Sequence, residues 1–103
     1  MPFPKFIIET RDKGDCLIIA KCKYHKQLVS DKDKVKGGGW WILDRENSTF
    51  TLHGNSHDFG AASMEDIKNC VLNKNVFTSR SLNKNLSNFI FKYQDQIGVV
   101  TKL

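Results

Sequence analysis

The segment Leu52–Ala62, which reads LHGNSHDFGAA, marks the place where a predicted strand gives way to a predicted helix. On its N-terminal side, Thr49–His53 alternates apolar and polar residues, as a half-buried strand does. Within the segment, Gly54 and Gly60 permit backbone conformations that other residues rarely adopt. A loop of this kind can direct several backbone N–H groups toward one point, and such a concavity favours an anion.

A single helix is predicted directly after this loop. Ser63 is placed to accept a hydrogen bond from a first-turn N–H group, and Asp66 is placed to reach back as in a capping box. Apolar residues then recur at helical spacing as far as Leu72, and Asn73-Lys74-Asn75 ends the pattern. We therefore expect one clear helix over residues 63–72.

The rest of the chain is rich in strand patterns. We expect strands at Lys5–Glu9, Cys16–Tyr24, Trp40–Asp44, Thr49–His53, Val76–Ser79, Asn88–Tyr93 and Val99–Leu103. Ser30–Lys36 is polar and charged and is expected to be a loop, whereas Arg45–Ser48 is expected to turn between two strands of a hairpin. Many strands with one helix predict an α+β fold, a small single domain over residues 1–103 with a mostly antiparallel sheet.

The composition limits the size, the partners and the compartment. With 103 residues, 40% of them hydrophobic, the chain can form one compact domain. Its net charge of +5 favours anionic partners, although a solvated basic surface is the simpler explanation.

An odd number of cysteines, Cys16, Cys22 and Cys70, indicates free thiols in a reducing compartment. No signal peptide or membrane span is recognised, so a cytoplasmic protein without membrane contact is expected.

The loop after the fourth strand has two interpretations. In the first, it is a phosphate-binding loop made of Gly54, Asn55, Ser56, His57 and Asp58. In the second, Asn55 and Asp58 cap a sharp turn and an aromatic side chain anchors it in the core, because Gly, Asn, Ser and Asp are the residues that turns prefer. From composition alone the turn is the better supported of the two.

The histidines offer two further kinds of site. His53 and His57 have a spacing that suits zinc on a helix, but here they fall on a strand and a loop, and no cysteine or glutamate cluster joins them. No metal and no cofactor is therefore predicted. His25 follows a lysine-rich strand, and a lone histidine is commonly a surface residue. It becomes a candidate general base or nucleophile only if the fold places it beside the loop.

The segment Gly37-Gly38-Gly39 has no side chains to keep another group away. The next two residues, Trp40 and Trp41, must point to opposite faces of a strand, so one belongs to the core and the other is partly exposed. Lysines crowd residues 21–36, but aspartates interrupt them, so nucleic acid is not the expected partner.

Three elements, taken in order along the chain, resemble the Janus/Ocnus family, to which phosphohistidine phosphatase belongs. Tyr24-His25 is similar to the pair that carries the active-site histidine of the family, and Gly37-Gly38-Gly39 is similar to its triple glycine. Leu52–Ala61 is similar to its phosphate loop. Lys5 stands near the position of a substrate-binding lysine. The resemblance covers roughly Lys5–Ser79 and leaves a strand-like C-terminal extension, residues 83–103, without a counterpart.

The resemblance implies a small α+β domain with a mixed, mainly antiparallel sheet. It implies His25 as an acid–base or nucleophilic residue in a metal-free phosphoryl hydrolysis that needs no cofactor. Lys5 and the residues Gly54–Asp58 would hold the phosphoryl oxygens, and Gly60 and the triple glycine would be structural. The partner would be a phosphorylated protein or a small anionic ligand.

The chain departs from the family at two positions. Trp40 stands where the family has an arginine, which removes a forked phosphate ligand. Asp58 adds a carboxylate beside the phosphate loop, which would repel an anion unless it points away. The alternative is a non-enzymatic domain that keeps the fold and contacts a protein or a nucleotide through Trp40 or Trp41 and the basic segment. The sequence leaves open whether the chain is an enzyme.

Overall fold

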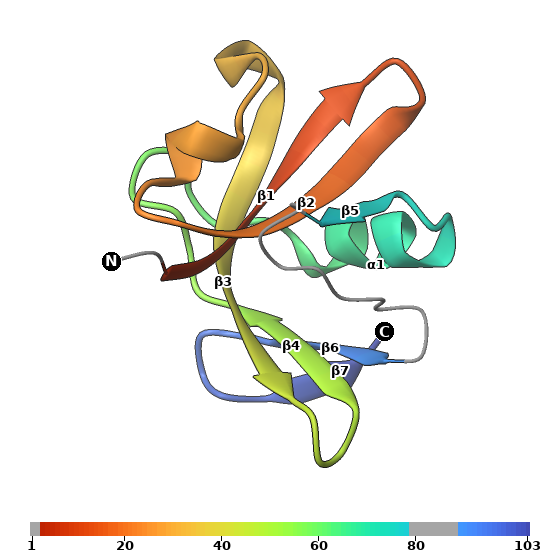
Figure 1. Cartoon of the computed structure of the whole chain (residues 1–103). Coiled ribbons are helices and arrows are strands. Elements are labelled where there is room, and N and C mark those ends of the chain that lie inside the picture. Colours follow the sequence, from red (N-terminus) through yellow and green to blue (C-terminus); the bar gives the residue numbers. More distant parts are fainter. Residues whose placement is uncertain (1–2, 79–88) are drawn as a thin grey trace.

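The computed structural model describes residues 3–78 and 89–103. Within them a seven-stranded sheet has the order β5-β2-β1-β3-β4-β6-β7 (Figure 1). The strands are β1 (Phe3–Arg11), β2 (Gly14–Cys22), β3 (Val35–Asp44), β4 (Thr49–His53), β5 (Val76–Thr78), β6 (Ile90–Gln94) and β7 (Val100–Lys102). The helical elements of the same residues are the α-helix α1 (Met64–Leu72) and two 3-10 helices, η1 (His25–Leu28) and η2 (Lys32–Lys34).

The prediction of an α+β fold is wrong, because the described part of the chain is mostly β. A single α-helix of nine residues accompanies the seven strands there. The largest difference lies at β3, which begins at Val35 inside the predicted loop Ser30–Lys36 and continues through the glycines. Glycines carry no apolar side chain, so alternation cannot indicate a strand there, although their backbone groups pair with β1.

The strand β3 joins the two halves of the sheet. Its first half pairs with β1 and its second half pairs with β4, both in antiparallel fashion. In Figure 1, β3 runs the length of the molecule, with β1 and β2 beside its upper part and β4, β6 and β7 beside its lower part. The sheet is mixed, since β2 pairs with β5 and β4 pairs with β6 in parallel. The predicted hairpin of β3 and β4 is confirmed.

The hydrophobic core lies between the curled sheet and α1. It is made of buried side chains from the inner face of β1 to β4, from the segment just before the helix and from the helix itself: Phe6, Ile8, Leu17, Ile19, Trp41, Phe50, Leu52, Ala62, Ile67 and Cys70. The predicted division of the two tryptophans is confirmed, since Trp41 is buried and Trp40 is half-buried. Burial of this apolar surface is the main stabilising contribution.

The helix α1 begins where the sequence predicted. Ser63 is its N-cap, and the Ser63 hydroxyl accepts a hydrogen bond of 3.1 Å from the Asp66 N–H group. Ile67 and Cys70 face the core. None of the helices among the described residues has the length and hydropathy needed to cross a membrane.

The C-terminal segment completes the sheet. Residues 89–103 supply β6, which lies parallel to β4, and β7, which is antiparallel to β6. Residues 79–88, which include the end of the predicted strand Val76–Ser79 and the start of the predicted extension 83–103, lie outside the described residues. The parallel pairing brings the C-terminal ends of β4 and β6 to the same edge of the sheet.

The triple glycine permits two segments to approach β3 closely. A Cβ atom on Gly37 would lie 2.5 Å from the Ala61 carbonyl oxygen, and one on Gly39 would overlap the His53 carbonyl oxygen. A Cβ atom on Gly38 would lie 2.6 Å from the Phe6 carbonyl oxygen and 3.2 Å from Cδ2 of His25. These glycines are therefore required by contact with the loop after β4 and with η1.

Substitution of Gly39 by alanine should destabilise the protein by about 3 kcal/mol, because the new Cβ atom overlaps backbone that cannot move aside alone. The matched control is Gly60→Ala, where a Cβ atom meets nothing within 4 Å and only the positive φ of 76° opposes it. That change should cost about 1 kcal/mol. Urea unfolding measures both, and equal losses would contradict the close-approach explanation.

Candidate functional site

His25 lies at the start of η1, and its neighbours fix its position. The Gln27 side-chain oxygen accepts hydrogen bonds of 2.9 Å from the N–H groups of Lys23 and Tyr24, which holds the turn that carries the ring. The His25 side chain is buried, packs over Gly38 and meets the Trp40 ring edge-on at 6.0 Å between centroids. The fold thus places the predicted histidine directly against the triple glycine.

The hydrogen bond of His25 determines which ring nitrogen carries the proton. Nε2 lies 2.8 Å from the carbonyl oxygen of Gly39. A carbonyl only accepts, so Nε2 donates, and in the neutral ring Nδ1 keeps its lone pair. No described residue bonds to Nδ1.

Burial and charge together make His25 neutral at pH 7. Burial is the largest effect and lowers the pKa of His25 below 6.5, the Gly39 hydrogen bond raises it, and the charge of Lys5 lowers it further. The carboxylate of Asp58 acts in the opposite direction. Lys5 from β1 and Asp58 from the loop are therefore both within electrostatic reach of the ring.

Lys5 is a buried cation at this site. Its side chain is only 8% exposed, and Nζ lies 4.7 Å from the centroid of the Trp40 ring and 5.8 Å from that of Phe3. The ion pairs among the described residues do not include Lys5. The aromatic rings stabilise the ammonium group through cation–π contacts and leave its charge without a neutralising carboxylate.

The loop after β4 is held in place by Ser56 and Gly60. Their backbone groups exchange hydrogen bonds of 3.1 and 2.9 Å, and the Gly60 carbonyl also accepts from the Gly38 N–H group at 3.0 Å. The Ser56 side chain is buried, and its Oγ accepts a hydrogen bond of 3.2 Å from the Phe59 N–H group. Ser56 therefore caps the turn, a role that the sequence analysis assigned to Asn55 and Asp58.

The predicted site residues fall into two groups. Lys5, His25 and the triple glycine are joined by contacts, and the charge of Asp58 reaches His25. By contrast, the hydrogen bonds of Ser56 to described residues stay within its own loop. The remaining loop residues, Gly54, Asn55 and His57, are exposed. No group of three histidine, cysteine or acidic residues within 3–78 and 89–103 is arranged to hold a metal ion.

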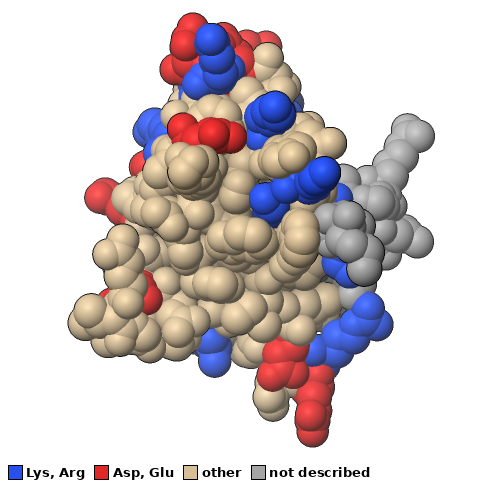
Figure 2. All heavy atoms as spheres, turned by 90° about the vertical axis from the view of Figure 1, so that its left-hand side faces the viewer, with Lys and Arg blue, Asp and Glu red and all other residues tan. Residues whose placement is uncertain are grey.

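Charged side chains are distributed unevenly over the side of the molecule that carries the site. Figure 2 shows the side of the molecule on which η1 and the loop lie, and uncharged residues fill most of its centre while charged side chains lie mainly around its edges. The net charge of +5 is therefore not concentrated over the candidate site. An anion bound here would depend on local groups, above all on Lys5 and on backbone N–H groups of the loop.

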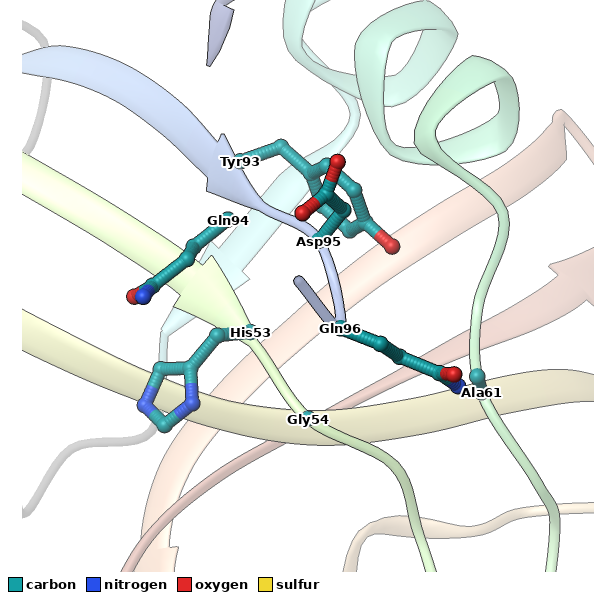
Figure 3. Close-up of a pocket in the computed structure, with 7 residues that line it drawn as sticks. All are labelled: His53, Gly54, Ala61, Tyr93, Gln94, Asp95 and Gln96. Carbon is teal, nitrogen blue, oxygen red and sulfur yellow. The ribbon is translucent and has the colours of Figure 1, made fainter. Parts of the chain in front are cut away.

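A pocket that the sequence analysis missed adjoins the loop. It has a volume of about 360 Å³ and lies at the C-terminal ends of β4 and β6 (Figure 3). Its lining residues are His53, Gly54, Ala61, Tyr93, Gln94, Asp95 and Gln96. The parallel pairing that unites them joins segments distant in sequence, and no local pattern indicates such a pairing.

The two charges near His25 should move its pKa in opposite directions. Lys5→Met keeps the shape of the side chain and removes a positive charge, so the pKa of His25 should rise. Asp58→Asn removes the opposing negative charge and should lower the pKa further. NMR titration of the ring protons measures both, with exposed Lys102→Met on β7 as the control. Shifts of the same sign in the two variants would contradict the geometry.

Comparison of the chain with protein-family models, with curated proteins and with solved structures found no match. The likeness to the Janus/Ocnus family therefore rests on the residues quoted in the sequence analysis.

Proposed function

We propose that the protein binds a phosphoryl group between His25, Lys5 and the loop Gly54–Gly60, and that His25 assists its hydrolysis. The observation that carries this proposal is the juxtaposition of a neutral imidazole and a buried ammonium group without a carboxylate partner among the described residues. The imidazole supplies a lone pair, and the ammonium group stabilises the charge on the phosphoryl oxygens. Backbone N–H groups of the loop add further donors.

Two routes use the lone pair on Nδ1 of His25. In the first, Nδ1 attacks phosphorus, the bond to the leaving group breaks with its electron pair, and water then cleaves the new N–P bond. In the second, Nδ1 takes a proton from a water molecule that attacks phosphorus directly, and the bond from phosphorus to the leaving group breaks with its electron pair going to the leaving group. In both, the hydrogen bond from Nε2 to Gly39 holds the ring in the required tautomer and orientation. Neither route uses a metal.

A second candidate function is a non-enzymatic nucleotide-interaction domain. The observation that favours it is a set of aromatic rings near His25 that are accessible and accompanied by lysines. Phe3 is 44% exposed and Tyr24 is 47% exposed, and Nζ of Lys23 and of Lys26 lie 5.4 and 5.2 Å from the centroid of the Tyr24 ring. Rings of this kind stack on nucleobases, and lysines attract the phosphates.

We also propose a cytoplasmic location. The three cysteines, Cys16, Cys22 and Cys70, are free thiols. Burial raises the pKa of Cys70 to about 12, with the charges of Asp15, Cys16 and Asp66 adding to the effect, so this thiol is unreactive at neutral pH. Unpaired thiols are typical of proteins in a reducing compartment.

Removal of the Lys5 charge should weaken anion binding. Lys5→Met should reduce the affinity for inorganic phosphate by about 10-fold to 100-fold, the usual effect of losing a hydrogen bond to a charged group. The control is Lys102→Met, which removes an equal charge from the exposed edge strand β7. NMR titration of the amide signals measures both affinities. An equal loss in the two variants would indicate that only the net charge matters.

Substitution of His25 should abolish most of the turnover. We expect His25→Gln to lower the rate of phosphohistidine-peptide hydrolysis by about 10² to 10⁴-fold, while the glutamine amide still donates to the Gly39 carbonyl.

In the wild-type protein the rate should fall only at pH values below 6.5, because the pKa of His25 is lowered and protonation removes its lone pair. Equal rates in the two proteins, or no turnover by either, would refute the enzymatic proposal. Binding of adenosine monophosphate without turnover would then favour the second candidate.

A further inference from the structure

The described residues that line the pocket beside the loop offer hydrogen-bonding groups and no cation. Among them, Tyr93, Gln94 and Gln96 supply a phenol and two amides, and Asp95 supplies a carboxylate. Burial lowers the pKa of His53, so this ring is uncharged at pH 7. No lysine or arginine belongs to the part of the lining that residues 3–78 and 89–103 supply. A phosphate group would meet no opposite charge on these residues. A neutral group with several hydrogen-bonding atoms would find both donors and acceptors.

The rigidity of the lining also suits a ligand. One carboxylate oxygen of Asp95, Oδ1, accepts hydrogen bonds of 3.1 and 2.8 Å from the N–H groups of Ile97 and Val99, which closes the turn between β6 and β7. The other oxygen has no partner among the described residues. A carboxylate fixed in this way is a good acceptor for a pair of hydroxyl groups. Figure 3 shows the Gln96 side chain extending toward Ala61 on the far side of the pocket.

The pocket and the proposed anion loop are continuous at the end of β4. Gly54, the first residue of the loop, also lines the pocket, and Ala61 lines it just beyond the other end of the loop. A molecule with its phosphoryl group on the loop would therefore carry its attached group toward the pocket. The volume of about 360 Å³ is within the range of small-molecule sites and admits a sugar or a nucleoside.

We infer that this pocket binds the hydroxylated, uncharged part of a small phosphate ester, such as the sugar of a sugar phosphate, while the loop holds the phosphoryl group. The inference rests on the proposed function and narrows it, since a small phosphorylated metabolite becomes the preferred ligand over a phosphorylated protein. The carboxylate of Asp95 and the side-chain amide of Gln96 would bind the hydroxyl groups.

The test compares inorganic phosphate, ribose, ribose 5-phosphate and a phosphohistidine peptide in NMR titrations of the full chain. Ribose 5-phosphate should bind about 10-fold more tightly than inorganic phosphate and should shift the amide signals of Gly54 and Gln96 together. Gln96→Ala should lower the affinity for ribose 5-phosphate about 10-fold through the lost hydrogen bonds. The control is Asn69→Ala, which removes an amide from the exposed side of α1 and should change neither affinity.

The outcomes separate the pocket from the anion site. Equal affinities for inorganic phosphate and ribose 5-phosphate, with shifts confined to the loop, would overturn the pocket assignment and leave the proposed function standing. Shifts of the pocket signals by ribose, without any response of the loop to phosphate, would support the pocket and overturn the proposed function. Tighter binding of the phosphohistidine peptide than of ribose 5-phosphate would overturn the ligand class. No response to any of the four would overturn both proposals.

Discussion

The close approach of two backbone segments to one strip of β3 is the constraint on which the rest of the structure depends. Gly37 and Gly39 receive the backbone of Ala61 and His53, Gly38 is hydrogen-bonded to the Gly60 carbonyl, and the His25 ring packs against Gly38. A side chain at any of these positions would push one of those segments away from the strand. The glycines therefore allow both the His25 ring and the backbone of the loop to lie against β3.

The second constraint is electrostatic. A lysine that is 8% exposed loses most of its hydration, and a nearby carboxylate is the usual compensation. Lys5 has the faces of Trp40 and Phe3 instead, which stabilise the ammonium group without neutralising it. Trp40 is thus the residue that keeps the cation available beside His25.

The sequence predicted local features better than their assembly. The cap at Ser63, the hairpin of β3 and β4 and the opposite orientation of the two tryptophans all follow from short-range patterns, and all are confirmed. The fold class failed because β3 extends through glycines and charged residues whose strand pairing depends on β1. The pocket was missed for the same reason, since Tyr93 and His53 meet only through the parallel pairing of β4 and β6. A serine in a glycine loop suits either a ligand or a turn. The bond from the Phe59 N–H group shows that Ser56 supports the turn, while its contact with phosphate stays a prediction.

Gly54 connects the two proposed binding regions. Its φ of 74° favours glycine, and a Cβ atom there would lie 2.8 Å from Cδ1 of Trp40. A side chain at this position would therefore displace the tryptophan that contacts both Lys5 and His25, and it would do so from the residue that also lines the pocket. The backbone of Gly54 thus borders both regions. A ligand that occupies both must lie across it, so any movement of this one residue changes the relative position of the phosphoryl site and the hydroxyl-binding pocket.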